Sequence, residues 1–188
     1  RIIMSAKITF FPVGNGDMTL IQLIDPSETK ILIDVNIRQA ADDPNDETYD
    51  VAKDLRNRLK FDDKNRPYID VFLLSHPDKD HFSGLSKHFY LGALEDYPDD
   101  EKEDNKKRII IREIWSSPIV FRRASQTHTL CDDAKEFNKE AKRRVMVNRV
   151  KNFNVQDGDR VLILGKDING KTDDLSSILI TEGQNFSH

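Results

Sequence analysis

The stretch YIDVFLLSHPDKDHFSGL, Tyr68 to Leu85, decides the fold because an apolar strand runs directly into a cluster of polar side chains. Residues 68–75 are apolar almost without interruption, which is typical of a central strand covered on both faces. Pro77 fixes one backbone angle and removes a hydrogen-bond donor, so the chain must leave the sheet sharply. The strand end therefore presents side chains with the spacing H-x-D-x-D-H: His76, Asp78, Asp80 and His81.

These side chains have the chemistry of a metal site. Histidine nitrogen and aspartate oxygen are ligands that suit Zn, Mn or Fe, and a turn after a buried strand leaves them little freedom to move. The alternative is that Asp78 or Asp80 caps a helix that starts near His81, with His76 an ordinary histidine at the sheet edge. Capping accounts for only one residue of the group, so we favour metal binding.

Strands dominate the rest of the sequence. Alternating or continuous apolar runs, bounded by Gly, Pro, Asn and Asp, predict strands at 7–13, 18–24, 29–35, 108–116, 159–165 and 175–183. The glycines of GNGD, between the first two, permit a tight hairpin. Apolar residues at helical spacing predict an amphipathic helix within 47–61, and a second helix is expected over about 130–147. A layered α/β or α+β sandwich is the simplest architecture.

Composition limits the class of protein. A chain of 188 residues with 37% hydrophobic residues fits a single domain, residues 1–188. No apolar run reaches the roughly 20 residues of a membrane span, and the first residues lack the features of a signal peptide, so we expect no membrane association. Cys131 is the only cysteine, which favours a reducing, cytoplasmic location. The net charge of −4 argues against coating nucleic acid through bulk charge.

The motif SHPDKDHFSGL resembles motif two of the metallo-β-lactamase superfamily, which usually reads H-x-H-x-D-H followed by a small residue and Gly. Asp78 stands where most members have histidine. The same departure, together with VGNGDMTLIQ (13–22) and ILIDVN (31–36), is similar to the branch that contains the hydrolase domain of ComEC-type DNA-uptake proteins. DDLSSILI resembles a late strand of that branch. The resemblance spans roughly residues 8–183 and implies a metallo-β-lactamase-like αββα sandwich.

The resemblance also implies roles for individual residues. His76 and Asp78 would bind one divalent ion, and Asp80 and His81 the second, with Asp80 and His81 at the catalytic centre. Asp34 corresponds to the acidic residue beneath the site, where supporting the ligands is favoured over binding the metal. For Asp17, stabilising the hairpin is favoured over a catalytic role. The cofactors would be two Zn or Mn ions, with Asp78 shifting preference toward Mn.

The chain departs from the family near its end. Family members close the site with an aspartate in a T-G-D-like turn and a final histidine, and neither precedes the terminal GQNFSH. We therefore expect a sandwich that lacks its C-terminal closing segment: either the sequence is part of a longer protein, or the site is incomplete and weak. His128 is a candidate additional ligand, although no motif surrounds it. His188 is not assigned as a ligand.

The function implied by the resemblance is metal-dependent hydrolysis, with a phosphodiesterase or nuclease favoured because of the branch that the chain resembles. Hydroxide activated by two metal ions suits hydrolysis of a phosphodiester. Two alternatives stay open: a hydrolase of small esters, thioesters or lactams, and a non-catalytic metal-binding interaction module. A nucleic acid partner could use cations of the second helix and its exit, although such residues often only keep a helix face solvated. They are Lys135, Lys139, Lys142, Arg143, Arg144, Arg149 and Lys151. The sequence specifies neither substrate, protein partners nor oligomeric state.

Overall fold

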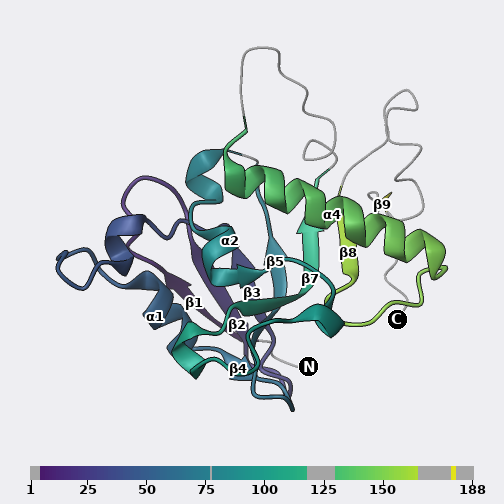
Figure 1. Cartoon of the computed structure of the whole chain (residues 1–188), viewed down its shortest axis with the longest axis horizontal. Coiled ribbons are helices and arrows are strands. Elements are labelled where there is room, and N and C mark those ends of the chain that lie inside the picture. The colour runs from purple at the N-terminus through teal and green to yellow at the C-terminus, as the bar shows by residue number, and fades with distance from the viewer. Residues whose placement is uncertain (1–4, 77, 118–129, 165–178, 181–188) are drawn as a thin grey trace.

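The computed structural model describes residues 5–76, 78–117, 130–164 and 179–180 (Figure 1). In these residues the strands form one mixed sheet in the order β1-β2-β3-β5-β7-β8-β9, with β4 paired to β5 and β6 to β7. The strands are β1 Ala6–Phe10, β2 Thr19–Leu23, β3 Lys30–Ile33, β4 Lys60–Phe61, β5 Pro67–Leu73, β6 Phe89–Tyr90, β7 Ile109–Ser116, β8 Arg160–Leu164 and β9 Leu179–Ile180.

Along the chain, the helices lie in the connections that follow β3. The α-helices are α1 Val51–Asn57, α2 Leu85–His88 and α4 Asp132–Val150, and the 3-10 helices are η1 Gln39–Asp42, η2 Lys79–His81, η3 Leu94–Asp96 and η4 Asp104–Lys106. This arrangement confirms a mixed α and β fold. None of the helices formed by the described residues combines the length and apolarity needed to cross a membrane.

The sheet has an antiparallel half and a parallel half. β1, β2 and β3 pair antiparallel, and β3, β5, β7, β8 and β9 pair parallel. Parallel neighbours need a crossover connection, and α1, α2 and α4 lie in the crossovers from β3 to β5, β5 to β7 and β7 to β8. The C-terminal ends of β3, β5 and β7 therefore meet at one edge of the sheet, and β5 is central, as predicted.

The core lies between the sheet and its helices. Buried residues in register run across the sheet: Leu20, Leu32, Phe72, Ile114 and Val161. The Phe137 ring of α4 packs at 5.8 Å from the Phe72 ring and at 5.3 Å from the Phe82 ring. Each such buried ring contributes roughly 2 to 3 kcal/mol to folding. Figure 1 shows α4 crossing the sheet on this side.

The opposite face of the antiparallel half is more open to solvent. Ile8 and Phe10 of β1 are 54% and 77% exposed, and Ile21 and Ile31, beside Ile8 in the register, are half-buried. In β2 and β3, Ile21 and Ile31 alternate with the buried Leu20, Lys30 and Leu32, as expected for a two-faced sheet. Strand β1 has no buried residue. The described residues thus cover one face of β2 and β3 well and leave β1 largely open to solvent.

Candidate metal centre

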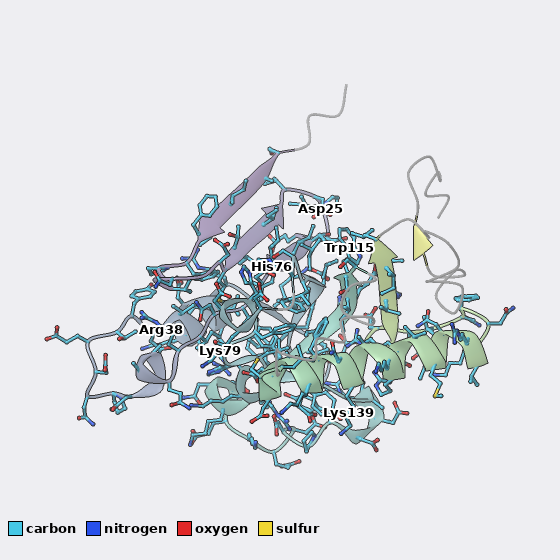
Figure 2. The ribbon with its side chains drawn as sticks, turned by 90° about the horizontal axis from the view of Figure 1, so that it is seen from above. Asp25, Arg38, His76, Lys79, Trp115 and Lys139 are labelled. Atoms are coloured by element: carbon cyan, nitrogen blue, oxygen red, sulfur yellow. The ribbon has the colours of Figure 1, made fainter. Side chains whose placement is uncertain are left out.

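The H-x-D-x-D-H segment lies beyond the C-terminal end of β5 and includes the 3-10 helix η2. Two backbone hydrogen bonds tie it to the residues that follow β3: Val35 N donates to His81 O at 3.1 Å, and Ile37 N donates to Ser83 O at 2.8 Å. The segment is therefore held against the neighbouring strand exit rather than projecting as a free loop. Figure 2 shows His76 in the central part of the molecule in a view turned by 90° from Figure 1.

Asp34 is the buried hub of this region. Its backbone has a φ of +56°, a left-handed conformation that aspartate tolerates better than most residues. Its carboxylate accepts hydrogen bonds from Ser75 N at 2.8 Å and from Ser75 Oγ at 2.5 Å. The same carboxylate lies 2.8 Å from His81 Nδ1, with both side chains buried. A carboxylate in this position favours the tautomer of His81 with hydrogen on Nδ1 and leaves Nε2 as an electron-pair donor.

The two histidines of the motif lie together. Their ring centroids are 3.6 Å apart, and His76 Nδ1 lies 2.9 Å from Ser75 Oγ. His76 Nε2 is 3.6 Å from Asp78 Oδ2, and His81 Nε2 is 3.6 Å from Asp80 Oδ2. Two ligands of a tetrahedral Zn²⁺, each at about 2.0 to 2.2 Å from the ion, are separated by roughly 3.3 to 3.5 Å. Each histidine–aspartate pair therefore fits half of a coordination sphere.

The two pairs do not close a complete site by themselves. Within the described ranges, no three or more His, Cys, Asp or Glu side chains converge on a point that could hold an ion. Zn²⁺ and Mn²⁺ take four or more ligands, so water molecules, substrate or residues outside those ranges would have to complete either sphere. His128, the candidate additional ligand, lies outside the described residues.

The capping alternative can be compared with the geometry. Asp78 stands at the N-cap of η2, but its side chain makes no capping hydrogen bond. Instead, the Asp78 carboxylate lies beside His76, and each of these two side chains is nearly half exposed. Asp80 is 52% exposed, whereas its neighbour His81 is 4% exposed. The motif thus combines one buried, fixed imidazole with three accessible polar side chains.

The loop between β1 and β2 packs directly on the motif. Gly16 has a φ of +113°, and a Cβ atom at that position would lie 2.7 Å from the Asp80 backbone oxygen. The Asn36 side chain donates a hydrogen bond to the backbone oxygen of Asn15 and so ties the loop to the strand β3 exit. Asp17, in the same loop, is exposed. Only a residue without a side chain fits at position 16.

Several residues of this site were missed by the sequence analysis. Ser75 bridges Asp34 and His76, and Asn36 fixes the loop, although neither is a metal-type ligand of the motif. Two exposed cations, Arg38 and Lys79, lie on the same side of His76 in Figure 2. The sequence signal for Ser75 was its position directly before the first histidine, where its backbone and hydroxyl both face the neighbouring strand end.

Two of the candidate nucleic acid-binding cations on α4 are engaged within the protein. Arg144, 1% exposed, lies 2.7 Å from Glu140 and donates to the backbone oxygens of Ile111 and Arg160. Arg143 binds both Glu140 and Asp159, and hydrogen bonds to these carboxylates raise its pKa. We call Glu140, Arg143, Arg144 and Asp159 the α4 charge cluster. It fixes α4 to the sheet and leaves neither arginine free for a phosphate.

Three of the other five candidate cations lie near carboxylates. Lys135 pairs with Asp132, Lys139 lies 3.9 Å from Glu136, and Lys151 lies 3.4 Å from Asp159.

The sequence contained the signal for the buried pair of Glu140 and Arg144. Glu140 and Arg144 are four positions apart, on the same helical stripe as Phe137 and Ala141, so both had to face the sheet.

The chain was compared with known proteins at three levels. No family model matches it, and no curated protein or solved structure matches it either.

Proposed function

We propose that this chain is a metal-dependent hydrolase with a metallo-β-lactamase-like site that acts on phosphodiesters, most specifically as a nuclease. The observation that carries this proposal is the pairing of each motif histidine with a motif aspartate at 3.6 Å while Asp34 and Ser75 occupy the opposite ring nitrogens. An imidazole bound at Nδ1 and open at Nε2 is the usual arrangement of a metal-binding histidine.

In this proposal His76 and Asp78 hold one divalent ion, and Asp80 and His81 hold the second. Two such ions supply hydroxide near neutral pH and stabilise charge on the attacked phosphate. Asp34 orients His81, and Ser75 orients His76. Lys79, which lies between Asp78 and Asp80 in the motif, is an exposed cation that would attract a phosphodiester.

A second candidate function is supported by a different observation. Because the described residues hold two pairs rather than a closed cage, the chain could bind one ion loosely and serve as an interaction module without turnover. Hydrolysis of small esters, thioesters or lactams on the same site is a third candidate. The phosphodiesterase and the interaction module differ in the number of metal ions bound per chain. The hydrolase of esters, thioesters or lactams differs from the phosphodiesterase in its substrate.

The test is a matched assay of the protein with Mn²⁺ and with Zn²⁺. Substrates are single-stranded DNA, double-stranded DNA, a chromogenic phosphodiester and a chromogenic lactam, with metal content measured on the same samples. We expect two ions per chain and cleavage of the phosphodiester. Cleavage should fall at least about 100-fold in Asp80→Asn, since a metal ligand matters at least as much as the residues that support it.

The matched control is Asp132→Asn, which removes one charge from an aspartate that is 98% exposed at the start of α4. It should retain full activity. Cleavage of the lactam alone would assign the third candidate function. One ion or none per folded chain, with no cleavage of any substrate, would replace the hydrolase proposal by the interaction module.

A further inference from the structure

A second feature of the molecule lies at the opposite end of β5 from the metal centre. A cavity of about 770 Å³ opens between α1, β4, the end of α2 and η4. β4 pairs with Pro67 and Tyr68, at the start of β5, whereas the metal-type ligands follow its end. The volume lies within the roughly 300 to 1,000 Å³ of small-molecule sites. The hydrolase proposal does not use this cavity.

Positive charge dominates the cavity walls. Four cationic side chains line it: Lys53, Arg56, Lys87 and Lys106. The Arg56 guanidinium is held by contacts of 3.4 Å with His88 Nδ1 and 3.5 Å with the Lys107 backbone oxygen. Both contacts use the same terminal nitrogen, Nη2, and they orient the guanidinium before any ligand arrives.

The two carboxylates of the wall are already engaged. Asp50 accepts a hydrogen bond from Lys53 N at 2.9 Å as the N-cap of α1. Asp104 accepts from Asn65 Nδ2 at 2.8 Å and lies 3.1 Å from the buried Nζ of Lys107. Lys106 pairs with Glu103, but both side chains are about two-thirds exposed, and such surface pairs are weak. The wall therefore carries four cationic side chains against two carboxylates, and its formal charge is positive.

One side of the cavity is apolar. Phe61 is 42% exposed although it is aromatic, and it lines the cavity beside Ala52 and Leu59. An exposed aromatic ring next to cations suits a ligand that carries both a flat ring and phosphate, because bases stack on aromatic side chains. Inorganic phosphate would use only the cations, and a nucleoside would use only the ring.

From these observations we infer that the cavity is a binding site for a free nucleotide. Its phosphates lie against Lys53, Arg56 and Lys87, and its base stacks on Phe61. The combination of a positioned guanidinium, flanking lysines and an open aromatic ring carries the inference. It does not rest on the proposed hydrolase activity.

The inference is tested by calorimetry on the full chain in the presence of EDTA, which removes any ion from the metal centre. The ligands are ADP, pyrophosphate and adenosine. We expect ADP to bind, and pyrophosphate and adenosine to bind at least about fivefold more weakly, because stacking and charge each contribute. Amide chemical shifts should change at 50–61, 87–88 and 104–106 and stay constant at 76–81.

Two variants and one control separate the contributions. Phe61→Leu should weaken ADP about fivefold or more without changing pyrophosphate, and Lys53→Gln should weaken both ligands about fivefold. Lys142→Gln removes the same charge from an exposed helical lysine of α4 and should change neither. Failure of ADP to bind at millimolar concentration overturns the inference. Equal affinities for ADP and pyrophosphate, or equal losses in Lys53→Gln and Lys142→Gln, also overturn it.

Discussion

The candidate metal centre and the α4 charge cluster are both built from charged side chains on buried secondary structure, but they differ in where their polar atoms point. In the α4 charge cluster, Arg144 is directed at Glu140 and at backbone oxygens of the sheet, and Arg143 at Glu140 and Asp159. In the metal centre, Asp34 and His81 are buried and paired, whereas His76, Asp78 and Asp80 are about half exposed.

The difference separates a structural cluster from a candidate functional one. A buried charge is stable only when its partners lie within the protein, and the α4 charge cluster meets that condition internally. The candidate metal centre fixes one nitrogen of each histidine and leaves the other beside an exposed carboxylate. Charged residues in sequence therefore indicate function less by their number than by the bonding positions that the fold leaves accessible.

The largest expected effect tests the α4 charge cluster. Arg144→Met should lower the free energy of unfolding by about 3 to 5 kcal/mol, since Glu140 would lose a buried partner. Urea denaturation measures this loss, and metal affinity of the folded fraction should stay unchanged. Lys142→Met, an exposed neighbour on α4, should change stability by no more than about 0.5 kcal/mol. Equal losses in both variants would contradict a structural role for Arg144.

The second prediction concerns the candidate metal centre. His76→Ala should lower metal affinity at least about 100-fold, as measured by competition with a chromogenic chelator, because it removes a proposed ligand. Its side chain is 47% exposed, so stability in EDTA should change little. Lys79→Ala, on η2, should leave metal affinity intact. Unchanged affinity in His76→Ala would remove His76 from the ligand set.

The third prediction probes the link between the buried and exposed parts of the metal centre. Asp34→Asn keeps a residue that tolerates the left-handed backbone but removes the negative charge beside His81. Metal affinity should fall about 10- to 100-fold while circular dichroism stays native. If the fold and the affinity were both unchanged, Asp34 would serve only to hold the Ser75 backbone.

The smallest expected effect concerns Asp99, another buried carboxylate whose partners lie within the protein. Burial opposes ionisation of Asp99, but hydrogen bonds from Arg108 and Lys102 outweigh it and lower its pKa far below the ordinary 3.8. The stabilisation is therefore complete above about pH 4 and is lost as the pH falls toward the lowered pKa. Asp99→Asn should cost about 1.5 kcal/mol at neutral pH.

The same pair of proteins supplies the control for Asp99. Urea denaturation of wild type and Asp99→Asn, at about pH 7 and about pH 2.5, should show a difference that shrinks in acid. A difference that is the same at both pH values would mean that packing, rather than charge, makes Asp99 stabilising. The Asp99 side chain is 1% exposed, so that outcome has a clear physical meaning.

Much of the fold could be predicted from periodicity. The expected strands correspond to β1, β2, β3, β5, β7 and β8, β9 lies within the expected 175–183, and the two expected helices contain α1 and most of α4. The two-residue strands β4 and β6 were missed because two residues carry no period. A sandwich of two sheets depends on long-range pairing, so it remains a proposal rather than a feature of the described sheet.

The candidate ligands could be grouped from the sequence, whereas the residues that support them could not. His76, Asp78, Asp80 and His81 could be grouped because they are adjacent in sequence, and Asp34 because it follows a strand. The contacts of Gly16 with Asp80 and of Asn36 with Asn15 join segments that only the folded sheet brings together. The orientation of Arg144 toward the sheet, in contrast, could be predicted from its place on the same helical stripe as Phe137 and Ala141.

The sheet changes from antiparallel to parallel pairing at β3, and this change predicts an order of folding. Antiparallel neighbours close short loops, whereas β5 must return over a crossover before Asp34 meets Ser75, 41 positions away. We therefore expect the contact between Asp34 and His81 to form after the β1–β2 hairpin. If His81 binds a metal ion as proposed, metal binding during refolding would report the moment at which β5 docks beside β3.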